Sequence, residues 1–437
     1  MQTQIVITFL VMIAAYAVAK WRKLSVEISM FLAAVAGGIY GAFISTPPLK
    51  ELARHLVEGS FTYLDVILIF VTATIFMAII SESGGVNYVV KNTIKYFYNK
   101  RLIALLLLMF ITLVPGALTG AGSVSLLVVG APVAMALGYL GIKQRRVAAI
   151  LFIIAGLSAA APPVNIWAMI LSAGTAIPYV GFELPLGIPV LLLGTFTILV
   201  LGWKKHEKSN LESALKQMPK IPEEMKWWKV LIPFLIFFGL VIALRIWPFS
   251  IPVMGLPLLF VISAFFAFIL SPKKINILKL SRDTVKKLTP LLATMIAVGM
   301  LQQIMTVTGV RGLISFTVIS IPLIILIISL AVIIPVSEGV FTYGGAAIIG
   351  IPLVWYFDSI GLHATVAIAG LSLLWPLGDG LPPTALIGRL SVMVSEYKKS
   401  YWSFLKSTWL PWIVITITGI LMVVFSTQLD FLVKWSS

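Results

Sequence analysis

The chain has 437 residues, of which 60% are hydrophobic and 11% are charged, and it carries a formal net charge of +16. Apolar runs of about 20 residues recur along its length, enough to cross roughly 30 Å of hydrocarbon, so the composition predicts an all-α integral membrane protein. The absence of cysteine excludes disulfides, iron–sulfur clusters and thiolate metal sites. The positive charge is explained by the preference of lysine and arginine for cytoplasmic loops, without nucleic-acid binding.

The first apolar run, residues 2–19, has two interpretations. Ala17-Val18-Ala19 resembles the cleavage site of a signal peptide. The preceding MQTQ carries no basic side chain, however, whereas signal peptides usually begin with one. We therefore predict a retained membrane span.

The predicted elements, in chain order, are membrane spans with two longer apolar segments among them. They cover 2–19, 27–46, 64–82, a long segment 102–140, 147–173, 184–203, 230–247, 252–270, 288–308, a long segment 313–360, 364–387 and 408–428. Glycine and proline recur in the second half at an offset of 220 residues, as in Pro115/Pro335, Gly130/Gly350, Pro132/Pro352, Gly141/Gly361, Pro162/Pro382 and Pro163/Pro383. The simpler interpretation is that these residues punctuate any membrane protein. The constant offset predicts an internal repeat, with a first repeat at 1–203, a basic cytoplasmic linker at 204–229 and a second repeat at 230–437.

The distribution of lysine and arginine orients the two repeats. With the loop Lys20-Trp21-Arg22-Lys23 placed in the cytoplasm, 27 of the 32 lysine and arginine residues fall inside and 5 fall outside. Each loop of the second half then lies opposite to its counterpart in the first half. This pattern predicts repeats of inverted topology, as in many secondary transporters. The chain is then a multi-pass protein of the cell (inner or plasma) membrane with both termini outside.

Each long segment must cross the membrane an even number of times, because basic loops on one side flank the first and uncharged loops on the other side flank the second. A re-entrant hairpin satisfies this condition, with its tip near 115–123 in the first repeat and near 335–345 in the second. A pair of full spans in each place is the alternative. Both tips are rich in glycine, serine and threonine, and irregular backbone at membrane depth is tolerated where protein or a water-filled cavity surrounds it. We therefore predict about ten spans plus two re-entrant hairpins.

The two Pro-Pro pairs interrupt segments that otherwise have the length of a span. Each proline lacks a backbone N–H and crowds the carbonyl group four residues back, so the helix breaks or kinks. A broken helix exposes N–H groups that can hold an anion and carbonyl groups that can hold a cation. One such kink would be a packing device. Two at matched positions, each with a glycine-rich hairpin, predict a binding site near the midplane.

The candidate residues for binding substrate and cation lie on the hairpin tips and the helix breaks. They are Thr119, Gly120, Gly122, Ser123, Ser158, Pro162, Pro163 and Asn165 in the first repeat, and Ser337, Glu338, Gly339, Thr342, Asp379, Gly380, Pro382, Pro383 and Thr384 in the second. An acid within a span costs roughly 2.5–3.5 kcal/mol on insertion scales, so Glu338 and Asp379 are predicted to couple transport to a cation or a proton. For each acid the alternative is a loop position that is wetted at the membrane surface.

Other polar residues are interpreted less specifically. Glu82, at the end of the third span, is predicted to lie at the membrane interface. Gln302-Gln303 lies in the middle of a span, where it either lines a cavity or forms a hydrogen bond between helices. Asn165 follows the first Pro-Pro pair, where its side-chain oxygen is a candidate cation ligand. The tryptophan and tyrosine residues are predicted mostly to anchor the chain at the interfaces.

Two stretches resemble a known family. GAGSVSLLVVGAPVAMALGYLGI followed by AAAPPV is similar to the first signature region of the large membrane subunit of TRAP transporters, and GIPLVWYFDSIGLHATVAIAG followed by GDGLPPTA is similar to the second. More broadly the chain resembles the ion-transporter superfamily of citrate, dicarboxylate and sodium–proton carriers. The resemblance implies sodium- or proton-coupled uptake of organic acids, and in TRAP systems also a small membrane subunit and an extracytoplasmic binding protein. The tips lack the Ser-Asn-Thr of several members, and Glu338 and Asp379 stand where TRAP subunits are usually uncharged. These departures favour a less characterised branch that works without a binding protein.

The sequence thus predicts a secondary active transporter, a sodium- or proton-coupled carrier of an organic anion such as a carboxylate. A sodium–proton antiporter, an inorganic-anion carrier and, in another class, an ion channel are the alternatives. An enzyme is not expected, because no clustered acids, His-rich site or Ser/His pair is visible. No cofactor is expected apart from a sodium ion for coupling. The expected partners are the substrate and membrane lipid but no nucleic acid, and a homodimer is left open.

Overall fold

The structure, a computed structural model, describes residues 2–44, 48–204, 218–219, 221–247, 252 and 254–434. Every element in these ranges is a helix, and nine of the helices are long and apolar enough to cross a membrane. The chain is therefore an all-α integral membrane protein, as its composition predicts. Most of the predicted linker 204–229 lies outside the described residues.

The helices divide between the two predicted repeats. Those of the first half are α1 Gln2–Trp21, α2 Val26–Phe43, α3 Leu49–Ser60, α4 Leu64–Glu82, α5 Gly85–Phe97, α6 Arg101–Thr119, α7 Gly122–Ser125, α8 Ala131–Tyr139, α9 Gln144–Ala160, α10 Ile166–Thr175 and α11 Glu183–Gly202. Those of the second half are α13 Trp227–Ile246, α14 Leu256–Ile269, α15 Ile277–Val307, α16 Val310–Ser320, α17 Leu323–Phe341, α18 Ile351–Ser359, α19 Ala364–Ser372, α20 Trp375–Gly378, α21 Leu386–Val394, α22 Tyr401–Lys406, α23 Trp409–Val424 and α24 Phe431–Lys434.

Several segments that we predict as loops are helical instead. Residues 47–63 contain α3, residues 83–101 contain α5, and the stretch 272–287 contains the start of α15. The prediction is wrong there because charged residues suggested loops, whereas the apolar residues between them follow a helical spacing. In α5, for example, Val86, Val90 and Ile94 are buried four residues apart. A helix with one apolar and one charged face is suited to the membrane surface.

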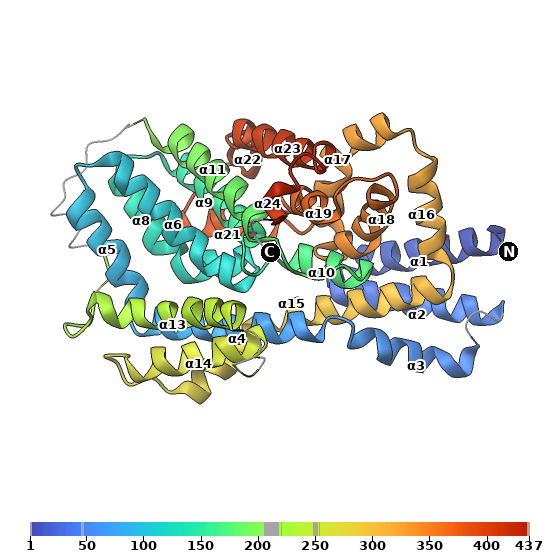
Figure 1. The fold of residues 1–437 in the computed structure, drawn as a ribbon, viewed down its shortest axis with the longest axis horizontal. Helices are drawn as coiled ribbons and strands as arrows, with labels where there is room; N and C mark the ends of the chain where they lie inside the picture. The colour runs from blue at the N-terminus through green and yellow to red at the C-terminus, as the bar shows by residue number, and fades with distance from the viewer. Residues whose placement is uncertain are drawn as a thin grey trace.

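The longest helix, α15, runs beside α3 and α4 along the length of the molecule (Figure 1). It has 31 residues, and at 1.5 Å per residue it is about 46 Å long, more than the roughly 30 Å of the hydrocarbon core. These helices therefore extend beyond the hydrocarbon and form a scaffold beside the hairpins and broken helices.

Each long apolar segment folds as a helical hairpin. The chain leaves α6 at Gly120, where φ is 70°, and returns through α7, a π-helix at Leu126–Gly130 and α8. It leaves α17 after Phe341 and returns through a π-helix at Ala346–Gly350 and α18. Both turns fall within the predicted tips. The re-entrant position of the hairpins in the membrane stays a prediction, because arms such as Gly122–Tyr139 have the length of a full span.

The local conformation repeats at the offset that the sequence indicates. The two π-helices and the helices that follow them, α8 and α18, stand 220 residues apart. After these helices, Gly141 and Gly361 both adopt the left-handed conformation, with φ of 77° and 85°. Short π-helices occur mostly at functional sites. The matched geometry supports the predicted repeat boundaries at 203 and 230.

Contacts between connecting segments join pairs that the charge pattern assigns to one membrane face. Arg245 and Glu183, both predicted outside, form an ion pair at 3.5 Å between Nη1 and Oε1. On the predicted inner face, the guanidinium group of Arg101 donates to the carbonyl oxygens of Leu140 at 2.5 Å and of Gly202 at 2.6 Å. These contacts are those that the predicted inverted topology requires.

Single cysteines at Gln144 and Ser359 are expected to label from opposite sides, because the two exposed residues follow corresponding hairpins of inverted repeats. With an impermeant thiol reagent applied outside, Ser359→Cys should react and Gln144→Cys should react only after the membrane is opened. The native chain has no cysteine, so it serves as the unlabelled control. Labelling of both positions from one side would contradict the inversion. A similar probe at Ser209 lies outside the described residues.

Candidate functional site

The two acids predicted for coupling lie together in the interior. Glu338 stands near the end of α17 and is 1% exposed, and Asp379 directly follows α20 and is 5% exposed. The helices α17 and α20 touch through their backbones, since a Cβ added at Gly378 would lie 2.1 Å from Pro335 O and 2.6 Å from Glu338 Cβ. This close approach requires glycine and brings the two carboxylates within electrostatic reach of each other.

Trp167 connects the first half of the chain to this pair of acids. Its indole Nε1–H donates to Glu338 Oε2 at 2.9 Å, and the side chain is completely buried in the first turn of α10. Its ring centroid lies 5.3 Å from that of Tyr343, at the tip of the second hairpin. The prediction that tryptophans serve as interface anchors is therefore wrong for Trp167. Its position two residues after Asn165, just beyond the first break, was the available signal.

The charge of the acids has no basic counterpart in this part of the structure. Of the described residues, none forms an ion pair with Glu338 or Asp379. Burying an unpaired carboxylate is expensive, and a bound cation or an added proton removes that cost. The alternative of a wetted loop position does not agree with the burial of either side chain.

In each half, the backbone after the Pro-Pro pair is tied to the first arm of the neighbouring hairpin. Val164 N donates to Ala117 O at 3.1 Å, and Thr384 N donates to Gly339 O at 3.2 Å. Thr384 adds a second bond from Oγ1 to the same Gly339 oxygen at 2.9 Å. The hairpins and breaks are thus brought together as predicted, and one cannot move far without the other.

A tyrosine braces each break from the helix that follows. Tyr179 Oη donates to Pro163 O at 3.2 Å and accepts from Asn165 N at 3.1 Å. Tyr401 Oη donates to Gly380 O at 2.7 Å. Both Pro-Pro peptide bonds are cis. The two tyrosines, which the sequence did not single out, occupy similar places after the two breaks.

The amide of Asn165 is used to build the first break. Its Oδ1 accepts from Ala168 N at 2.9 Å, which caps α10, and its Nδ2 donates to Ala160 O at 2.9 Å, at the end of α9. Asn165 therefore satisfies backbone groups on both sides of the interruption. Its role as a cation ligand stays a prediction.

The predicted hydroxyl ligands lie in the interior beside the helix ends. Those of Thr119, Ser158, Ser337 and Thr342 donate to backbone carbonyls nearby in the chain, at 2.6–2.8 Å, and Ser123 is 5% exposed. A hydroxyl that donates keeps its lone pairs for a cation. Thr342 adopts φ 52° and ψ −138° at the second tip, where the first tip has Gly120. Such backbone costs about 1–3 kcal/mol in a residue with a side chain, and it is typical of functional sites.

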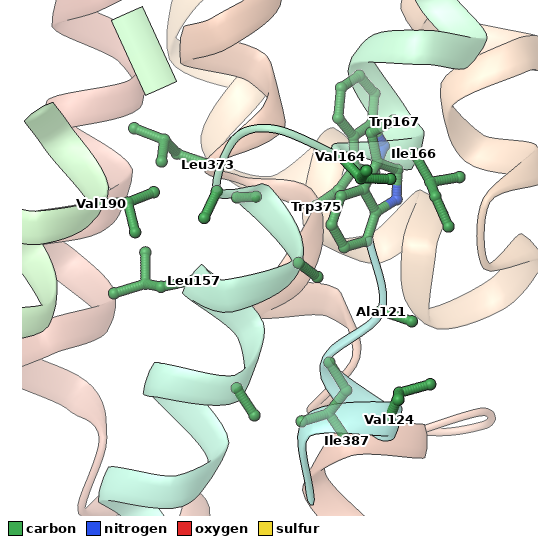
Figure 2. Packing of buried hydrophobic residues seen from close by; sticks show 14 of the residues in the cluster. Ala121, Val124, Leu157, Val164, Ile166, Trp167, Val190, Leu373, Trp375 and Ile387 are labelled. Carbon is green, nitrogen blue, oxygen red and sulfur yellow. The ribbon is translucent and has the colours of Figure 1, made fainter. Parts of the chain in front are cut away.

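The two proline pairs have different surroundings. Pro162 and Pro163 line an apolar cavity of about 200 Å³ together with Leu118 and Val190. The second pair, Pro382 and Pro383, is exposed. Of the remaining candidates, Gly122 packs against Ala155 of α9 and Ile387 of α21, and Gly339 packs against Leu381. Figure 2 shows the first contact region, where Ile387 of the second half lies beside Ala121 and Val124 of the first hairpin.

The other polar residues are resolved by their contacts. Gln302 Oε1 accepts a hydrogen bond from the hydroxyl of Tyr63, which joins α15 to the start of α4. This contact corresponds to the helix–helix alternative of the prediction. Glu82 is exposed at the end of α4, as expected for an interfacial acid.

Comparisons with known proteins support the fold but name no family. No family model matches the chain, and no curated relative matches its sequence. Among solved structures, the YdaH transporter of Alcanivorax borkumensis matches with a TM-score of 0.58 at 13% identity, over 86% of this chain and 87% of that chain. MtrF of Neisseria gonorrhoeae, from a class of antimetabolite efflux pumps, matches with a TM-score of 0.56 at 12% identity, over 86% and 84%. The chain therefore shares the fold of membrane transporters, and neither match points to the TRAP family.

Proposed function

We propose that the chain is a secondary active transporter that couples the movement of an organic anion to a sodium ion or a proton. The observation that carries the proposal is the buried pair Glu338 and Asp379, which lies where the second hairpin meets the second helix break and has Trp167 of the first half as a donor. A site shared between two halves can open alternately to either side when the halves rock against each other. The shared fold with two transporters, YdaH and MtrF, agrees with this function.

The cation takes its place beside the two carboxylates. Carboxylate, hydroxyl and carbonyl oxygens are the ligands that hard cations prefer. Glu338 and Asp379 supply charge, and the hydroxyls of Ser337 and Thr342 lie on the same hairpin. A proton on either carboxylate would serve the same purpose, because both remove the cost of a buried negative charge.

The anionic substrate is assigned to the starts of the half-helices. α10 and α21 both begin just after a break, and the return arm of the first hairpin begins at Gly122. Each start carries partial positive charge and backbone N–H groups. The carboxylate class also follows from the resemblance to organic-acid carriers. A small subunit, a binding protein and a homodimer remain proposals on that same ground, and the two buried acids favour a carrier that works without a binding protein.

The purified chain in proteoliposomes tests the proposal. Uptake of labelled dicarboxylates and aromatic carboxylates is measured with sodium and pH gradients imposed separately. We expect saturable uptake that accumulates substrate when one of the gradients is directed inward or outward. Conductance that is linear with voltage would instead identify a channel. Sodium–proton exchange without an organic anion, or uptake of an inorganic anion alone, would identify the other carriers of the superfamily.

A further inference from the structure

A basic crevice lies apart from the acids, where α9 begins, α11 ends and α22 passes into α23. It has a volume of about 290 Å³ and is lined by Arg145, Arg146, Ser403, Lys406, Ser407 and Trp409, together with apolar residues of α11 and α23. Arg145 and Arg146 belong to the first half of the chain, and the other four belong to the second.

The chemistry of the crevice is that of a phosphate site. Of the described residues, none forms an ion pair with its three cations. Arg146 Nη1 donates to Leu201 O at 3.5 Å, which directs it toward the end of α11. Arginine binds phosphate through two parallel N–H groups, and serine hydroxyls supply further donors. The first turn of α9, a 17-residue helix, adds partial positive charge.

An apolar stripe leads from the crevice along α23. Trp409, Ile413, Ile417 and Leu421 follow one another at intervals of four residues and are 61%, 47%, 52% and 47% exposed. Residues at this spacing lie on one face of a helix. A cationic end with a hydroxyl lining, continued by a long apolar face, matches a molecule with a phosphate headgroup and acyl chains.

We propose that this crevice binds the headgroup of an anionic phospholipid, with the acyl chains along the stripe on α23. The three cations lie on the face that the charge pattern assigns to the cytoplasm, where anionic lipids attract basic residues. The bound lipid would join the start of α9, which leads to the first break, to α22 and α23, which follow the second break. It would therefore stabilise the contact between the two halves at this face.

Lipid binding to the full chain in a neutral detergent tests the proposal without a transport assay. We expect phosphatidylglycerol or cardiolipin to raise the unfolding temperature and to be retained in native mass spectra, and phosphatidylcholine to do neither. The triple variant Arg145→Gln, Arg146→Gln, Lys406→Gln should bind the anionic lipid roughly a hundredfold more weakly, at about tenfold or somewhat less per cation. Its unfolding temperature in detergent alone reports whether it folds. Should it fail to fold, Arg145→Gln and Lys406→Gln singly should each weaken binding about severalfold.

The matched control removes the same charge elsewhere on that predicted face, with Lys95, Lys398 and Lys399 changed to Gln, all of which are exposed. It should keep the lipid effect. An equal loss in the control would overturn the proposal, because surface charge alone would then explain the binding. Equal stabilisation by inorganic phosphate or glycerol 3-phosphate would also overturn it, since the crevice would then bind a soluble phosphate without need of acyl chains.

Discussion

Glu338→Gln and Asp379→Asn are each expected to reduce gradient-driven accumulation of substrate to the level of passive equilibration. Each change keeps the size of the side chain and removes the negative charge that a dehydrated cation needs. Both acids are buried and, within the described residues, have no basic partner, so a neutral amide leaves the fold less burdened while the coupling is lost. The measurement is uptake into proteoliposomes with the sodium and pH gradients varied separately.

Counterflow separates coupling from substrate binding in these variants. Exchange of labelled for unlabelled substrate requires no net movement of the coupling ion, so an acid variant that still exchanges has lost coupling alone. Ser123→Ala and Asn165→Ala are the matched comparisons, and we expect smaller losses of accumulation from both. If both acid variants accumulate substrate as well as the parent, the carboxylates take no part in coupling, and the first repeat must hold the site.

The two repeats should contribute unequally to the cation site. At the offset of 220 residues, the counterparts of Glu338 and Asp379 are Leu118 and Ala159, which are buried and apolar. The first half offers hydroxyls and carbonyls near its break, and its Trp167 acts through Glu338. Formal negative charge therefore comes from the second half alone, which is why the acid variants should be the most severe.

The sequence predicted those features that depend on local backbone chemistry. Proline and glycine fix where a helix must stop, so the breaks at Pro162-Pro163 and Pro382-Pro383 and the turns at both hairpin tips were placed correctly. Their common offset also revealed the pairing of π-helix segments and of Gly141 with Gly361. Charged stretches were less informative, because α3 and α5 carry their charges on one face of a helix.

Contacts between distant segments could not be predicted from one sequence. The bond from Trp167 to Glu338 joins residues 171 positions apart, and no spacing rule relates them. The bracing bonds from Tyr179 and Tyr401 likewise depend on how the chain returns to each break. Tryptophan and tyrosine suit both a membrane interface and a buried donor role, so residue type alone did not distinguish the two.

Replacement of Pro162-Pro163 or of Pro382-Pro383 by Ala-Ala is expected to abolish transport while the protein still inserts into the membrane. Alanine restores the missing N–H groups and favours helix by about 3 kcal/mol per residue over proline. A continuous helix would pair the backbone groups that the breaks leave open for ligands. It would also displace Val164 and Thr384, whose N–H groups tie each break to a hairpin at Ala117 and Gly339.

Uptake in proteoliposomes and the yield of folded protein in detergent are the two measurements for these double variants. Ala-Ala at Pro47-Pro48, a Pro-Pro pair distant from the proposed site in the sequence, is the matched control and should keep its transport. Normal uptake by both site variants would reduce the prolines to packing devices. Loss in the second variant alone would agree with a cation site built mainly by the second half, because Asp379 precedes only that break and its carbonyl accepts from Gly388 N at 3.1 Å across it.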